Sequence, residues 1–149
     1  MSEDRILKLE RLIRGAPESV FDAWTKPERL VEWWGPEGFT CPEHALDVRV
    51  GGAWRTVMRA PDGGNHICSG VYREIDRPRR LAFTWAWDQE DGSRGHETVV
   101  TVEFSARDGG TLVRLTQETF ADMQHRDNHE KGWASSFNDL ERLFAKAAA

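Results

Sequence analysis

Cysteine is scarce in this sequence, and the scarcity limits the chemistry open to the chain. Cys41 and Cys68 are the only two, and neither has another cysteine two or three residues away. Their spacing suits neither a zinc knuckle nor a disulfide framework. We therefore expect both cysteines to be reduced packing residues.

Positive charge is also in deficit. The chain has 20 basic and 25 acidic residues and a net charge of −5, so it lacks the basic field that holds a phosphate backbone. Its apolar runs are only a few residues long, far short of the roughly 20 that span a bilayer, and its start lacks a signal-peptide core. We expect a cytoplasmic protein with no nucleic-acid partner and no membrane span.

Large aromatic rings are abundant instead. Seven Trp and seven Phe accompany a single Tyr in 149 residues, and each buried ring removes about 150–250 Å² from water. A chain of this length suits one domain, residues 1–149, with one core. The fold must therefore be one that encloses many rings.

The sequence predicts one strand followed by two short helices near the N-terminus, and one long helix at the C-terminal end. Residues 5–14 favour a first strand, because apolar residues interleave with charged ones, although the spacing of Leu9, Leu12 and Ile13 would also suit a helix. Pro17 and Pro27 each suit the first turn of a short helix, the second of which includes two tryptophans and ends at Gly35-Pro36. From about Met123 to Ala147, apolar residues recur at helical spacing without proline, which predicts one long amphipathic helix.

Between these helices, compact turn signals separate runs with strand character. Links this short make neighbouring strands antiparallel, because parallel neighbours need crossovers of a dozen or more residues. The predicted strands are Ala45–Val50, Ala53–Arg59, His66–Ile75, Leu81–Trp87, His96–Phe104 and Thr111–Thr119. Alternation along two of them predicts the inward rows Leu81, Phe83, Trp85, Trp87 and His96, Thr98, Val100, Val102, Phe104, and a shift of one residue would reverse each row.

Four segments of the sequence resemble a known family. They are APESVFDAWTKPERLVEWWGPEGFT, DVRVGGAWRTVMRAPDGG, GVYREIDRPRRLAFTW and the GW of the C-terminal helix. Together with the order of elements, they resemble the bacterial activator of Hsp90 ATPase homologue 1-like (AHSA1-type) family of the START-like, or SRPBCC, helix-grip superfamily. The resemblance extends over about residues 6–146.

The resemblance implies an α+β helix-grip (START-like, Bet v 1-like) fold. A curved antiparallel sheet of about seven strands wraps around the long C-terminal helix, and a cavity between them is partly roofed by the two short helices. Related superfamilies hold lipids, hormones or polyketides there. Rings on the inward rows agree with an apolar cavity, although they could equally fill that space as core.

We expect the cavity to bind an apolar or aromatic small molecule, lipid-like or polyketide-like. The candidate ligand-binding residues are Trp34, Phe39, Arg55, His66, Cys68, Phe83, Trp85, Trp87, His96, Thr98, Val100, Trp133 and Phe137. An enzyme of the cyclase, aromatase or hydrolase type is the first alternative, but we can assemble no catalytic group, because a strand places the neighbours His96 and Glu97 on opposite faces.

A metal centre and a nucleotide cofactor are not expected. His125 and His129 have the i, i+4 spacing by which a helix presents two imidazoles to one metal, but their stretch is strongly polar and suits a solvated helix start. The paired glycines do not continue into a phosphate-binding motif. We predict no cofactor.

A protein-interaction or stress-response role is the second alternative, since the family is named after an Hsp90 co-chaperone. The first strand begins at about Arg5, so we expect no counterpart of the co-chaperone's N-terminal domain and no Hsp90-type partner. A homodimer is compatible with the sequence, though no pattern requires one.

Overall fold

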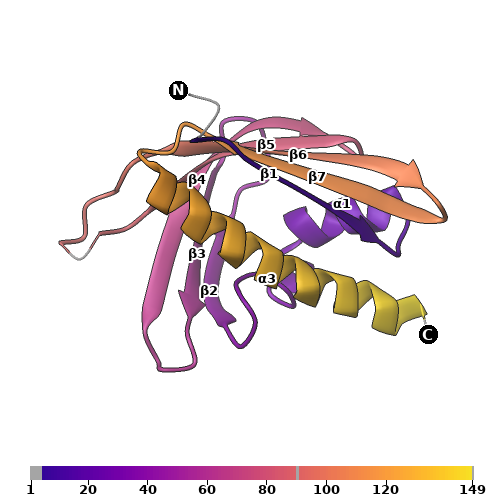
Figure 1. The fold of residues 1–149 in the computed structure, drawn as a ribbon, viewed down its shortest axis with the longest axis horizontal. Helices are drawn as coiled ribbons and strands as arrows, with labels where there is room; N and C mark the ends of the chain where they lie inside the picture. The colour runs from indigo at the N-terminus through magenta and orange to yellow at the C-terminus, as the bar shows by residue number, and fades with distance from the viewer. Residues whose placement is uncertain (1–4, 90, 149) are drawn as a thin grey trace.

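The computed structural model describes residues 5–89 and 91–148. Over those residues the chain forms seven strands and three helices, with a long helix at the C-terminal end (Figure 1). The elements are β1 (Leu7–Ile13), α1 (Pro17–Thr25), α2 (Pro27–Leu30), β2 (Thr40–Leu46), β3 (Ala53–Arg59), β4 (Asn65–Asp76), β5 (Arg80–Trp87), β6 (Thr98–Arg107), β7 (Gly110–Glu118) and α3 (Met123–Ala148).

All seven strands belong to one antiparallel sheet with the order β1-β7-β6-β5-β4-β3-β2. The meander predicted from the short links is confirmed, and β1 closes it by pairing with β7. The sheet is strongly curved: β1, β5, β6 and β7 form one layer, β2–β4 turn away from it, and α3 crosses the open side (Figure 1). This is the helix-grip arrangement that the family resemblance implies.

The two short helices follow their proline signals, but the second is shorter than predicted. Both have proline in the first turn and an acidic residue beside it. α2 ends at Leu30, and Trp33 and Trp34 lie in the turn that follows rather than in the helix. The indole N–H of Trp33 donates to the Ala23 carbonyl at 2.9 Å, so this bond anchors the turn to α1.

The second strand lies earlier in the chain than predicted. The sequence favours a strand over 45–50, whereas β2 is Thr40–Leu46 and residues 47–52 form a loop. The loop closes on itself, with Gly52 N–H donating to the Arg49 carbonyl. A Cβ on Gly52 would lie 2.0 Å from the Asp47 carbonyl oxygen, so only glycine fits this turn.

The alternation predicted for β5 and β6 is largely confirmed. In β6, the row from Thr98 to Phe104 is buried at alternate positions. In β5, every residue from Leu81 to Ala86 is buried, but the core cluster includes Leu81, Phe83 and Trp85 and not Ala82 or Ala86, and the partly buried Trp87 packs against it. β6 begins only at Thr98, so the prediction that His96 continues this row is wrong. His96 lies in the preceding loop, exposed, where no strand pairing fixes its face.

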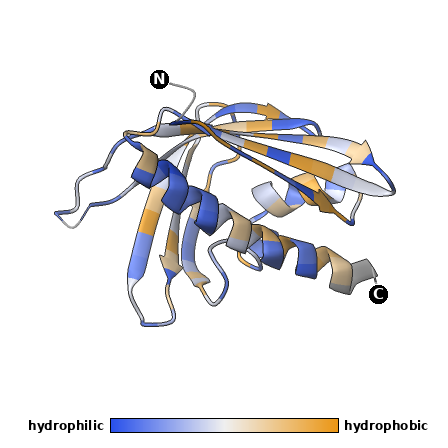
Figure 2. Cartoon of the chain, in the orientation of Figure 1, coloured by the Kyte–Doolittle hydropathy of each residue, from blue (hydrophilic) through white to orange (hydrophobic). Residues whose placement is uncertain are grey.

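Helix α3 buries an apolar stripe against the sheet. Trp133, Phe137, Leu140 and Phe144 are all at least 95% buried, as their helical spacing predicts. The helix is mostly hydrophilic over its first turns and has both characters further along (Figure 2). Among residues 5–89 and 91–148, we find no helix with the length and apolar character needed to cross a membrane.

Candidate functional site

A cavity of about 460 Å³ lies between the N-terminal half of α3, the loop that follows α2, and strands β3–β5. Its wall is mainly aromatic and apolar, with a few neutral polar groups. The lining residues are Trp34, Gly35, Pro36, Phe39, Met58, His66, Trp85, Trp87, His125, Asn128, His129, Gly132, Trp133 and Ser136. None of these described lining residues is Asp, Glu, Lys or Arg.

Helix α3 supplies one face of the cavity. Its contributions recur every three or four positions from His125 to Ser136, which is the spacing of a single helix face. Gly132 lies in the middle of this face. A Cβ built on Gly132 would meet no atom within 4 Å, so the helix presents open space there instead of a side chain.

Tryptophan rings from three elements form much of the wall: Trp133 of α3, Trp34 of the loop after α2, and Trp85 and Trp87 of β5. Trp85 lies at their centre, with its ring 5.3 Å from Trp133, 5.4 Å from Trp87 and 5.7 Å from Trp34. Two of the indoles are fixed by polar partners behind the wall: Trp34 N–H donates to the Thr56 hydroxyl, and Trp133 N–H donates to the Gln117 side-chain oxygen, each at 2.9 Å. The wall is therefore held in place by buried hydrogen bonds.

His129 is held as a neutral imidazole. The indole N–H of Trp87 is a donor only, so at 2.8 Å the Nε2 of His129 must accept from it. The proton of a neutral ring then lies on Nδ1, which donates to the His125 carbonyl at 2.6 Å. Burial lowers the pKa of His129, opposed by this backbone bond, and both ring nitrogens are occupied.

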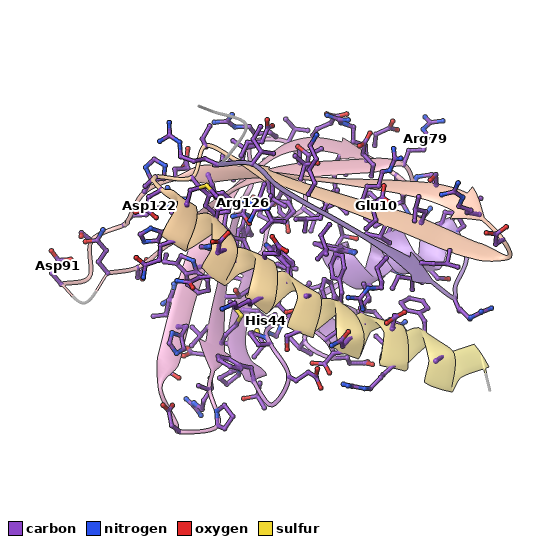
Figure 3. All side chains as sticks on the ribbon, viewed as in Figure 1. Glu10, His44, Arg79, Asp91, Asp122 and Arg126 are labelled. Carbon is purple, nitrogen blue, oxygen red and sulfur yellow. The ribbon has the colours of Figure 1, made fainter. Side chains whose placement is uncertain are left out.

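The structure gives no support to the two-histidine metal spacing. His129 Nε2 has no lone pair left for a metal, and His125 pairs through Nδ1 with the Asp122 carboxylate at 2.7 Å. Asp122 directly precedes α3 (Figure 3), and its carbonyl accepts from the Arg126 N–H at 3.3 Å. Within the described part of the chain, no cluster of three or more His, Cys, Asp or Glu side chains could hold a metal.

The loop between α2 and β2 is fastened to α3 by Glu37. Its backbone N–H donates to the Ser135 hydroxyl at 2.8 Å, and its carboxylate accepts from Asn138 at 3.0 Å and from Arg142 at 2.8 Å. The Asn138 bond, followed by that of Arg142, lowers the pKa of Glu37. Gly35, Pro36 and Phe39 of this loop line the cavity, so Glu37 fastens one cavity wall to another.

Six of the thirteen sequence-predicted site residues line this cavity. They are Trp34, Phe39, His66, Trp85, Trp87 and Trp133. His66 is exposed at the rim, where its ring lies 5.8 Å from that of Phe39. Their role in binding stays a prediction, but their convergence on one space is a feature of the fold.

The other seven lie elsewhere. Four of them are packed behind the wall or in the core: Phe83 against Trp54 and Tyr72, Val100 in β6, Phe137 against Trp24, and Cys68. Cys68 contacts the Thr56 hydroxyl, and burial raises the pKa of its thiol. The inward face of a curved sheet is larger than the cavity, so most inward residues become core.

Arg55, Thr98 and His96 are set apart from the cavity for other reasons. Arg55 is exposed, since its neighbours Trp54 and Thr56 take the inward positions of β3. The Thr98 hydroxyl donates to the Trp85 carbonyl and accepts from the Gln117 side-chain amide. His96 bonds to the Thr119 carbonyl outside the sheet.

Eight lining residues were missed by the sequence interpretation. They are Gly35, Pro36, Met58, His125, Asn128, Gly132 and Ser136, together with His129. One pattern in the sequence could have indicated the α3 lining residues. Small and neutral polar residues recur there at i, i+3 and i+4, beside the apolar stripe of the helix. A solvated helix start has the same spacing, so the sequence did not distinguish the two.

The fold and the cavity together define a class. A curved antiparallel sheet that grips a long C-terminal helix, with two short helices after its first strand, is the helix-grip architecture of START-like proteins. The sequence profile described as "Activator of Hsp90 ATPase homolog 1-like protein" matches residues 14–145. The chain belongs to this family.

Solved structures agree with that assignment. The AHSA1 protein from Silicibacter pomeroyi is 33% identical, covers 95% of this chain and 99% of its own, and superposes with a TM-score of 0.88. A protein from Chromobacterium violaceum is 28% identical, with 93% and 96% coverage and a TM-score of 0.82. One from Nitrosomonas europaea shares the fold at 23% identity, 99% coverage of both chains and a TM-score of 0.82. No curated protein matches the chain.

Proposed function

We propose that the protein binds a small, mainly aromatic molecule in the cavity against α3. The observation that supports this most strongly is the open volume of about 460 Å³ amid four tryptophans, a phenylalanine and a methionine. Ligand pockets of about 300–1,000 Å³ with apolar walls and a few polar groups are typical of small-molecule sites. A core with this many rings would otherwise close on itself, because interiors pack densely.

The cavity residue Gly132 supports the same conclusion. Glycine inside a helix is about 1 kcal/mol less favourable than alanine, yet the site has room for the extra methyl group. Glycine at position 132 therefore lowers the stability of α3 and leaves more of the cavity volume open. A binding cavity explains that combination.

Binding is tested by filling the cavity from this position. 2-Ethylnaphthalene, an uncharged aromatic probe, is titrated by equilibrium dialysis into the wild-type protein, Gly132→Leu and Lys131→Leu. Lys131 is exposed, does not line the cavity, and adds the same side chain one residue away. We expect saturable binding to the wild type and Lys131→Leu, and at least a tenfold loss in Gly132→Leu. Equal binding by all three folded proteins, or by none, would contradict the proposal.

A further inference from the structure

Histidine supplies the titratable side chains of the cavity wall. The described lining residues include His66, His125 and His129, and none of them is Asp, Glu, Cys, Tyr, Lys or Arg. His66 and His125 are exposed, whereas His129 is partly buried. The charge of the wall therefore depends on histidine protonation, and His129 is the one of the three that is held between two hydrogen-bond partners.

The hydrogen bonds of His129 leave one atom for a second proton. Nδ1 already has the proton that it donates to the His125 carbonyl at 2.6 Å, so a further proton adds at Nε2. Nε2 is the atom that accepts from the Trp87 indole N–H at 2.8 Å, and an indole N–H cannot accept in return. Two N–H groups would then face each other across this distance. The bond between Trp87 and His129 therefore exists only while His129 is neutral.

Loss of this bond changes the cavity wall. Trp87 lines the cavity at the end of β5, with its ring 5.4 Å from that of Trp85 and 5.9 Å from that of His129. Within residues 5–89 and 91–148, its N–H has no acceptor other than His129. Protonation therefore releases a wall ring and places a cation beside it. Both changes oppose an uncharged apolar ligand, because a charge in an apolar site is costly to bury.

The other elements packed against His129 supply no negative charge to balance a proton on it. β5 and the segment before α3 present aromatic rings to it, those of Trp85, Trp87 and Phe120, with centroids 6.3, 5.9 and 5.0 Å away. β4 contributes His66 to the same cavity, and His66 is itself a base. Among the described residues, the hydrogen bonds of the His129 ring go to an indole and to a backbone carbonyl, and none goes to a carboxylate.

The charged side chains of α3 near His129 are engaged with one another. His125, one turn earlier, pairs with Asp122 at 2.7 Å. Arg126 pairs with Glu130 at 2.9 Å. Burial lowers the pKa of His129, its bond to the His125 carbonyl opposes that shift, and the charge of the His125 ring adds to it. His129 therefore takes up its proton at a lower pH than an exposed histidine does.

Resting on the proposed function, we propose that the Trp87–His129 pair makes ligand binding depend on pH: the cavity holds an uncharged aromatic molecule while His129 is neutral, and releases it when His129 is protonated. Ligand and proton then compete for the protein. By thermodynamic reciprocity, a bound ligand must also lower the pH at which His129 takes up its proton.

Binding of 2-ethylnaphthalene across a pH series tests the proposal, because this probe has no ionisable group of its own. Equilibrium dialysis from about pH 7.5 to about 4.5 spans the titration of histidine. The wild type is compared with His129→Gln and with the matched control His125→Gln. Glutamine at position 129 has an oxygen that can accept from Trp87 but does not titrate. His125→Gln removes another cavity histidine from the same helix and keeps the backbone carbonyl that holds His129.

We expect the wild-type affinity to fall at least about threefold over this range, with a limiting slope of about tenfold per pH unit at the acid end, as for one competing proton. The affinity of His125→Gln should fall similarly. That of His129→Gln should stay within about twofold throughout, because its side chain gains no charge. Far-UV circular dichroism at each pH separates ligand release from unfolding.

The indole N–H signal of Trp87 in ¹⁵N NMR, assigned with Trp87→Phe, gives a second readout. In the wild type it should titrate with the same midpoint as the affinity, and saturating 2-ethylnaphthalene should move that midpoint to lower pH. These two results decide if His129→Gln fails to fold.

Two kinds of failure are distinguishable. A wild-type affinity that does not change with pH, an equal fall in His129→Gln, or a Trp87 signal that does not titrate would overturn this inference and leave the proposed function standing. Absence of 2-ethylnaphthalene binding at about pH 7.5, where His129 is neutral, would refute the proposed function and this inference with it.

Discussion

Replacing Gly132 by alanine should stabilise the protein. The residue is the tenth of the 26 in α3, inside the helix, and a Cβ there meets nothing within 4 Å. No steric term opposes the change in helix propensity, which is about 1 kcal/mol in favour of alanine. We expect the free energy of unfolding to rise by about that amount and the melting temperature by about 2–4 °C for a chain of this size.

Urea denaturation is the direct assay. With a slope of about 1–3 kcal/mol/M, a gain of about 1 kcal/mol moves the midpoint up by about 0.3–1 M. Gly70→Ala is the matched control, because a Cβ there would lie 1.8 Å from the Thr84 carbonyl oxygen, and it must lower the midpoint. A midpoint that falls in Gly132→Ala would show that the position is not open, and the argument from the cavity face of α3 would fail with it.

Three further results are expected. Trp133→Ala should cost about 3–5 kcal/mol of unfolding free energy, because its ring is buried among other rings; a urea-derived loss below about 1 kcal/mol would contradict this. Burial lowers the pKa of folded His129 below its unfolded value of about 6.5, so the unfolded state binds more protons below that pH and stability should fall as pH drops through this window. A His129→Gln variant should show a shallower fall in urea midpoints between pH 7 and 5, and an identical profile would contradict the role of the Trp87 bond. Glu37→Gln weakens the ion pair with Arg142, so 2-ethylnaphthalene should dissociate faster in stopped-flow fluorescence, and an unchanged rate at low salt would refute a fastening role.

Most of the architecture could be predicted because its signals are local. Each hairpin link contains its own turn residues, and short links allow only antiparallel neighbours. The predicted bounds of β2 and α2 were wrong because tertiary contacts determine where these two elements end. The end of β2 depends on the close approach of Gly52 to the Asp47 carbonyl, and the end of α2 depends on the bond from Trp33 to α1.

The sequence predicted an apolar cavity but only six of its lining residues. Alternation identifies inward residues such as Phe83 and Val100, yet it does not say which of them border open space and which are covered by others. The pairing of Trp87 with His129 joins residues 42 positions apart, and no sequence period signals such a contact. Ser136 and Gly132 have weak signals for the same reason: small residues on a helix suit a cavity wall and a solvated surface equally.

The central claim is that the cavity holds a small aromatic molecule, and native mass spectrometry of the protein purified from its own host tests it most directly. We expect a mass above that of the 149-residue chain, and denaturing extraction should release an uncharged aromatic compound. That adduct should be reduced or absent in Gly132→Leu and present in Lys131→Leu. A bare chain mass, together with no measurable binding of 2-ethylnaphthalene, would contradict the account.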